Sequence, residues 1–135
     1  MIFASDINNI VEVENLIESL LEQKKISDTV YGNVIVALTE AALNAIKHGN
    51  QSDPSKMVTI THSFTPTEII FVVEDQGHGF DYNNLPDPTN PENLEKENGR
   101  GLFIINNLAD KLEFDNNGSK MTISFSLNVE EQVEA

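Results

Sequence analysis

The stretch Glu40-Ala41-Ala42-Leu43-Asn44-Ala45-Ile46-Lys47-His48-Gly49 places a polar stripe beside an alanine-rich one. Glu40, Asn44 and His48 recur every four residues, so on an α-helix each lies only about 40° around the axis from the one before. The asparagine oxygen is a hard ligand suited to Mg²⁺, and the glutamate one turn away can orient a hydroxyl or a water. The alternative is an ordinary solvent-facing stripe, which these residues alone do not exclude.

Working outward, this stretch ends a helix that begins near Ser27 and stops at Gly49, which suits the left-handed residue that often follows a helix. An earlier amphipathic helix is expected over residues 7–21, with Asp6 as its N-cap, after a short edge strand at Ile2-Phe3. The apolar stripe of the longer helix consists of Val30, Val34, Leu38, Ala41, Ala42 and Ala45.

The remaining regular segments read as two hairpins and one helix. The β-branched runs 58–64 and 68–73 are separated by a Thr-Pro-Thr turn, and the second run is apolar almost throughout, as a central strand would be. A helix is expected from Gly101 to Lys111, followed by a hairpin of residues 112–115 and 121–127 that turns at Asn116-Asn117-Gly118.

Between the hairpins, residues 81–98 carry three prolines and almost no periodicity. Loops of this length inside a compact domain are usually functional, so we interpret the segment as a lid. The acidic tail, about residues 129–135, is expected to fray. With no internal repeat and no boundary, residues 1–135 are interpreted as a single domain.

Two glycine-containing boxes flank the predicted lid. In Asp75-Gln76-Gly77-His78-Gly79-Phe80, the aspartate follows a buried strand, where its carboxylate could accept a hydrogen bond from a base edge; an Asp-rich turn is the alternative. Asn98-Gly99-Arg100-Gly101-Leu102 precedes the predicted helix. We therefore expect the amides of Gly101 and Leu102 to point outward at the positive end of the helix dipole, where a phosphate would sit.

Composition excludes some classes of partner. The chain has 22 acidic and eight basic side chains and a formal charge of −14, which opposes binding to a phosphate backbone, so no nucleic-acid partner is expected. There is no cysteine, no N-terminal run resembling a signal peptide and no stretch that approaches the apolar length of a membrane span. We expect a cytoplasmic protein with no membrane association.

The order and spacing of the three boxes resemble the GHKL ATPases, which include histidine kinases, gyrase B subunits and heat-shock chaperones. Within that superfamily the chain looks most like the bacterial anti-sigma factor serine/threonine kinases, and the resemblance covers almost its whole length. It implies an α+β fold, the two-layer Bergerat ATP-binding sandwich, with a mixed, mostly antiparallel sheet and helices packed on one face. A histidine kinase is not expected, because no helix with a phospho-accepting histidine precedes the boxes.

The resemblance also implies a role for each box. Glu40 would be the general base, Asn44 would hold Mg²⁺, and Asp75 would take the amino group of the adenine of ATP. Ser119, in Gly118-Ser119, stands where the family has Gly-Thr and keeps the hydroxyl. The full set of implied ATP contacts is Asn44, His48, Asp75, Gly77, Gly79, Phe80, Gly99, Arg100, Gly101, Leu102 and Ser119.

The function that this resemblance implies is an ATP-dependent serine kinase and anti-sigma regulatory factor. Its partners would be an anti-sigma-factor antagonist with a STAS-like domain and a sigma factor, in a pathway that regulates transcription, and the chain would form a homodimer. Two alternatives stay open. One is a nucleotide-gated binding protein that sequesters a regulator without phosphorylating it, and the other is an ATP-binding regulator unrelated to transcription. Glu40 favours the kinase, since a pure binder needs no base there.

Overall fold

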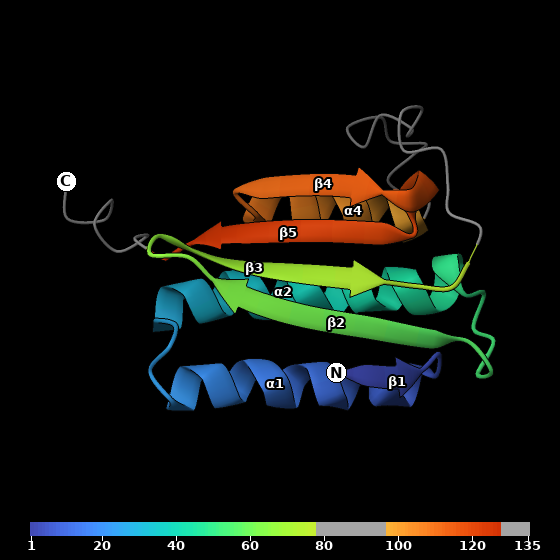
Figure 1. Ribbon diagram of the computed structural model, residues 1–135, viewed down its shortest axis with the longest axis horizontal. Coiled ribbons are helices and arrows are strands. Elements are labelled where there is room, and N and C mark those ends of the chain that lie inside the picture. Colours follow the sequence, from blue (N-terminus) through green and yellow to red (C-terminus); the bar gives the residue numbers. More distant parts are fainter. Residues whose placement is uncertain (78–96, 128–135) are drawn as a thin grey trace.

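The computed structural model describes residues 1–77 and 97–127 (Figure 1). In chain order the elements are strand β1 (Ile2–Ala4), a 3-10 turn (Ile7–Asn9), helix α1 (Ile10–Glu22), helix α2 (Asp28–Asn44), a π-helical turn (Ala45–Gly49), strands β2 (Met57–Phe64) and β3 (Glu68–Glu74), helix α4 (Glu97–Leu108), strand β4 (Lys111–Asp115), a second 3-10 turn (Asn116–Gly118) and strand β5 (Lys120–Ser126).

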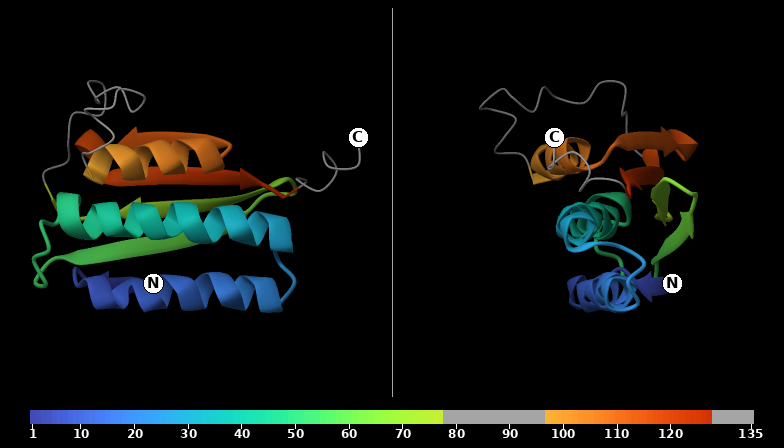
Figure 2. Two further views of the ribbon diagram at one scale, coloured as in Figure 1. Left: turned by 180° about the vertical axis from the view of Figure 1, so that it is seen from behind. Right: turned by 90° about the vertical axis from the view of Figure 1, so that its left-hand side faces the viewer.

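The strands form one five-stranded sheet in the order β1-β2-β3-β5-β4, and every pairing between described strands is antiparallel. Helices α1, α2 and α4 lie side by side on one face of it, so the described chain has two layers (Figure 2). The α+β fold class expected from the sequence is confirmed. Strand β3 lies in the middle of the sheet, as its apolar run predicts.

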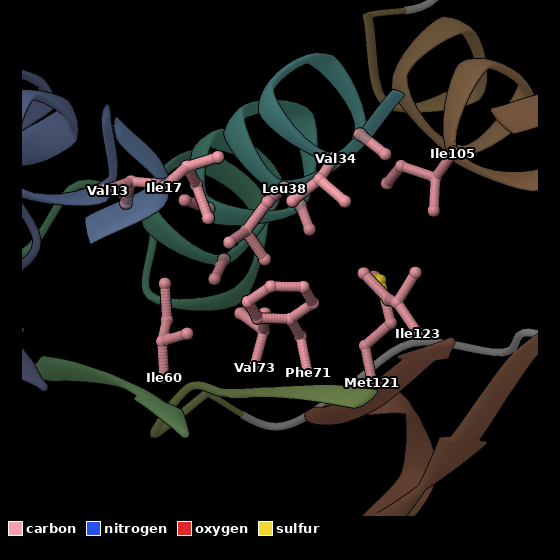
Figure 3. Close-up of a cluster of buried hydrophobic side chains, with 14 of the residues drawn as sticks. Val13, Ile17, Val34, Leu38, Ile60, Phe71, Val73, Ile105, Met121 and Ile123 are labelled. Atoms are coloured by element: carbon pink, nitrogen blue, oxygen red, sulfur yellow. The ribbon is translucent and has the colours of Figure 1, made fainter. Parts of the chain in front are cut away.

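The core lies between the two layers. Helix side chains such as Val13, Ile17 and Leu38 point toward sheet side chains such as Phe71 and Ile123, and all five are fully buried (Figure 3). Burying one such side chain contributes about 1.5–3 kcal/mol relative to leaving it in water. The six residues predicted as the apolar stripe of the long helix are all buried, which confirms that stripe. Helix α2 is therefore held firmly against the sheet.

The helix starts follow their capping residues. The Asp6 carboxylate accepts a hydrogen bond from the Asn8 backbone N–H, so it caps the 3-10 turn, and α1 begins after that turn. Ser27 Oγ accepts from the Val30 backbone N–H at 3.3 Å and starts α2 where the sequence predicts.

Two predictions about helix ends are wrong. Gly49 does not have a left-handed backbone. It lies in the π-helical turn, and the positive φ angles come later, at Gln51 (53°) and Ser52 (57°). Helix α4 starts at Glu97 and ends at Leu108, not from Gly101 to Lys111. It stops early because the Asp110 N–H donates to Ser124 O and draws the chain into the sheet.

One described stretch is long and apolar enough to cross a bilayer, so the expectation that none comes close is also wrong. Residues Asp28–Gly49 have a mean hydropathy of 1.3 over the best window. These residues form α2 and the π-helical turn. The apolar side chains that raise the hydropathy include the stripe of α2, which is buried against the sheet.

Candidate nucleotide site

The polar stripe of α2 faces helix α4 at the end of the molecule where β3 ends. Glu40 and Asn44 lie on the last turns of α2, and His48 lies in the π-helical turn that continues it. The structure brings these three side chains to one pocket, whose full lining is Glu40, Leu43, Asn44, Lys47, His48 and Gly101. The stripe is thus the wall of a pocket between α2 and α4.

A second pocket adjoins the first through Asn44. Its lining comes from α2, the end of β3 and the turn before β5, and consists of Ala41, Asn44, Ala45, Val73, Asp75, Gly118, Ser119 and Met121. The two pockets share Asn44: Glu40 and His48 line the first with it, and Asp75 and Ser119 line the second.

The Asn44 side chain carries a free acceptor. Its Oδ1 is buried and has no hydrogen-bond partner among residues 1–77 and 97–127. A buried polar atom without a partner costs about 1–3 kcal/mol, so such an atom usually has a partner, which is a water, an ion or a ligand where the protein supplies none. A hard oxygen at the wall of a pocket fits Mg²⁺, which takes one or two protein groups when phosphates supply the rest.

The described residues contain no group of three His, Cys, Asp or Glu side chains that could hold a metal ion by themselves. Asn44 Oδ1 would be a protein ligand of Mg²⁺, which keeps several waters and takes further oxygens from phosphates.

The Asp75 carboxylate sits in a cradle of backbone. Its Oδ1 accepts a hydrogen bond from the Gly77 N–H at 2.8 Å. A Cβ at Gly49 would overlap the carboxylate, and a Cβ at Gly77 would overlap the carbonyl oxygen of Gly49. Both glycines are therefore required by close approach and not by a left-handed φ. The Asp75 residue also lines the second pocket.

The strand end beside Asp75 is fixed by the neighbouring turn. The Asp75 N–H donates to Ser119 O at 2.9 Å, which joins the end of β3 to the start of β5. Ser119 Oγ donates to Asn116 O at 2.9 Å, and a hydroxyl that donates can also accept a hydrogen bond through its lone pairs. The turn is made possible by positive φ angles at Asn116 (52°) and Gly118 (96°).

Burial raises the pKa of Asp75 above its ordinary value, and the Gly77 N–H and Lys56 oppose this only in part. The folded chain thus holds this proton more tightly than the unfolded chain. The carboxyl contributes stability below its unfolded pKa of about 3.9, and that contribution is lost as pH rises through the folded pKa.

We therefore expect Asp75→Asn to unfold at a higher temperature than the wild type at neutral pH without nucleotide, because the amide removes a buried charge. The difference should shrink as pH falls through the raised pKa of the folded carboxyl and vanish below the unfolded pKa of about 3.9. Thermal unfolding across that pH range measures it. Glu14→Gln, on the exposed side of α1, controls for the loss of one negative charge from a chain of −14. A wild type more stable than Asp75→Asn at neutral pH would contradict the expectation.

The third box differs from its prediction. Because α4 begins at Glu97, Gly101 and Leu102 lie inside the helix and not at its N-terminus, so their amides are not the outward-pointing donors expected. Gly101 instead allows close packing, since a Cβ there would lie 3.2 Å from Glu40 Oε2. Leu102 is buried in the core and Arg100 is exposed. Gly99 lies in the first turn of α4, where amides lack intrahelical partners.

Some predicted contacts fall outside the described residues. Gly79 and Phe80 do, as do residues 81–96 of the predicted lid, while residues 97 and 98 belong to α4. Asn50 is fully buried and linked to the Asp75 turn, and it is not among the predicted site residues. An asparagine after a glycine is an ordinary turn signal, so no pattern in the sequence distinguishes it.

Comparisons with known proteins show the family to which the chain belongs. A family described as "Histidine kinase-like ATPase domain" matches residues 3–127. Serine-protein kinase RsbW of Bacillus cereus (strain ATCC 10987 / NRS 248) is 30% identical over 105 residues, which are 73% of this chain and 65% of that protein. Serine-protein kinase RsbW of Bacillus anthracis is 29% identical with the same coverage. The chain thus spans 65% of the length of these relatives.

Among solved structures, the blue-light activated histidine kinase EL346 of Erythrobacter litoralis is similar over 79% of this chain and 33% of its own, with a TM-score of 0.54 and 19% sequence identity. At that identity the similarity shows a shared fold alone.

Proposed function

The chain belongs to the histidine kinase-like ATPase domain family, as its motifs suggest, and we propose that it is an ATP-dependent protein serine/threonine kinase and anti-sigma regulatory factor. The observation that carries the proposal is the shared wall of the two pockets. A carboxylate, Glu40, lies one helical turn from an unpaired amide oxygen, Asn44 Oδ1, and Asp75 lies on the far side of that amide. This order supports Glu40 as the general base, Asn44 as the metal ligand and Asp75 as the group that recognises adenine.

In this proposal ATP lies across both pockets. Asp75 accepts a hydrogen bond from the exocyclic amino group of adenine, in the pocket lined also by Ser119. The phosphates extend past Asn44 toward Glu40 and the start of α4, where the free amides belong to residues 97–100 and not to Gly101 and Leu102. Gly79 and Phe80 of the second box stay predicted contacts, as does His48, which lines the first pocket.

The transfer step is assigned to Glu40. It accepts the proton of the serine or threonine hydroxyl as the hydroxyl oxygen bonds to the γ-phosphorus, and the bond from that phosphorus to the bridging oxygen breaks to leave ADP. Asn44 Oδ1 would hold Mg²⁺, which neutralises charge on the phosphates when it is bound. Glu40 lies against Gly101 of α4, so the packing of two helices sets where its carboxylate can reach.

The substrate and partners are proposed on narrower grounds. The relatives are named serine-protein kinases, which supports a protein hydroxyl as the acceptor. An anti-sigma-factor antagonist with a STAS-like domain as substrate, a sigma factor as second partner, a homodimeric state and a cytoplasmic location follow from the resemblance of the motifs.

The test is a transfer assay with the purified chain, ATP, Mg²⁺ and the antagonist-like protein encoded nearest to it. We expect phosphate on one serine or threonine of the antagonist, and no transfer in the presence of a chelator. If the antagonist binds only when nucleotide is present but receives no phosphate, the kinase proposal fails and the nucleotide-gated binding protein takes its place.

A further inference from the structure

Asn50 is a fully buried polar residue, 0% exposed, at the end of the π-helical turn. Its side-chain Nδ2 donates to Ser5 Oγ at 2.7 Å and to Met57 O at 3.0 Å. Its Oδ1 accepts from the Gln76 N–H at 2.7 Å. One side chain therefore joins the end of β1, the start of β2 and the turn that carries Asp75.

Gln76, in the turn that carries Asp75, is also bonded through its own side chain. The Gln76 side-chain Oε1 accepts from the Met57 N–H at 2.6 Å, so Gln76 is held both through its backbone and through its side chain. Ser5 is itself fixed, because its Oγ donates to Lys56 O at 2.7 Å. A fully satisfied buried network of this kind rigidifies the segments that it joins.

The backbone around Asn50 needs such support. Gln51 and Ser52, the next two residues, both have left-handed φ angles, which cost energy for residues other than glycine. Backbone bonds from Ser52 N–H to Ile46 O and from Asp53 N–H to Asn50 O hold this segment in place. It lies directly after Gly49, whose carbonyl and α-carbon contact Gly77 and Asp75.

We infer that Asn50 is a positioning residue for base recognition: by holding the Gln76 amide it fixes the Asp75 carboxylate between Gly49 and Gly77, and so sets the preference for adenine over guanine. The inference rests on the proposed nucleotide function. A carboxylate held in one position accepts from the amino group of adenine, whereas guanine presents a carbonyl oxygen at the same ring position. A carboxylate that moves loses this discrimination.

The experiment compares the dissociation constants of ATP and GTP, each with Mg²⁺, for wild type, Asn50→Ala and Ser5→Ala. Wild type is expected to prefer ATP, and Asn50→Ala to lower the ratio of GTP to ATP dissociation constants about tenfold, mainly by weakening ATP binding. Ser5→Ala removes a bond from the same network but leaves the Gln76 bond. It should lower the melting temperature while keeping the wild-type ratio.

The outcomes separate the two proposals. If Asn50→Ala melts earlier but keeps the wild-type ratio, Asn50 is merely structural and the inference is overturned. A wild type that binds both nucleotides equally well also overturns it, while ATP binding stands. If wild type binds neither nucleotide, the proposed function itself fails.

A measurement on wild type covers the case in which Asn50→Ala does not fold. The backbone amide of Gln76 should be protected from hydrogen exchange in the nucleotide-free protein, because its partner is a buried side chain. An unprotected Gln76 amide would mean that the turn is not held before nucleotide binds, which overturns the inference.

Discussion

Replacing Glu40 with alanine is expected to lower the rate of phosphoryl transfer about 100- to 10,000-fold, which is the usual contribution of a general base. ATP affinity should stay within about threefold of wild type. The contact assigned to adenine comes from Asp75 and the contact assigned to the metal comes from Asn44, so neither depends on Glu40. Single-turnover transfer to the antagonist and an independent binding titration with ATP measure the two quantities separately.

The control for this variant is Glu14→Ala, which removes an exposed carboxylate from α1, away from both pockets, and should leave transfer unchanged. Equal losses of transfer and of ATP affinity in Glu40→Ala would place Glu40 in nucleotide binding and remove it from proton transfer. Unchanged transfer would leave the kinase proposal without a base.

Gly77→Ala is expected to weaken ATP binding about 100-fold or more, the second large effect. A Cβ at this position would overlap the carbonyl oxygen of Gly49, which is backbone and cannot rotate away. The turn must therefore shift, and with it the Gly77 N–H that orients the Asp75 carboxylate. Losses of this size arise when a substitution breaks a tightly packed backbone contact. Calorimetric titration with ATP measures the affinity.

The chain offers a matched control in Gly32→Ala. Gly32 is exposed on α2, and a Cβ there meets nothing within 4 Å. Alanine is a better helix former than glycine, so this variant should gain about 0.5–1 kcal/mol of stability and keep the ATP affinity of wild type. If Gly77→Ala binds ATP as tightly as Gly32→Ala does, the cradle around Asp75 has no part in binding.

Much of the fold could be predicted from the sequence because periodicity reports which face of an element is buried. The stripe of α2 and the β-branched runs of β2 and β3 each needed only their own residues, and the N-cap Ser27 marked its helix. These signals are local, and the tertiary structure agrees with them.

The structural role of a glycine is hard to predict from sequence, because a glycine can serve a turn, a helix end or a close contact. The sequence predicts a left-handed φ for Gly49, but this residue makes room for Asp75. It predicts that a helix starts at Gly101, but this residue lies within α4 and makes room for Glu40. Which purpose applies depends on a residue distant in sequence, so no local pattern could decide it.

Part of the candidate site could be predicted because helical periodicity shows which residues share a face. The i, i+4, i+8 spacing placed Glu40, Asn44 and His48 on one face, which the structure has as a pocket wall. Asn50 could not be predicted, because its importance arises from β1 and the Asp75 turn meeting around it. The contacts assigned to Gly79 and Phe80 stay predictions.

The position of Asn44 in the wall common to both pockets has a thermodynamic consequence. In the proposed function, the ion that Asn44 Oδ1 would hold is also bound by the phosphates of the nucleotide, so the binding of the ion and the binding of the nucleotide are coupled. Such coupling is reciprocal: whatever factor an ion adds to the affinity for the nucleotide, the nucleotide adds to the affinity for the ion. The Asn44 amide would thus couple the affinity for the ion to the affinity for the nucleotide.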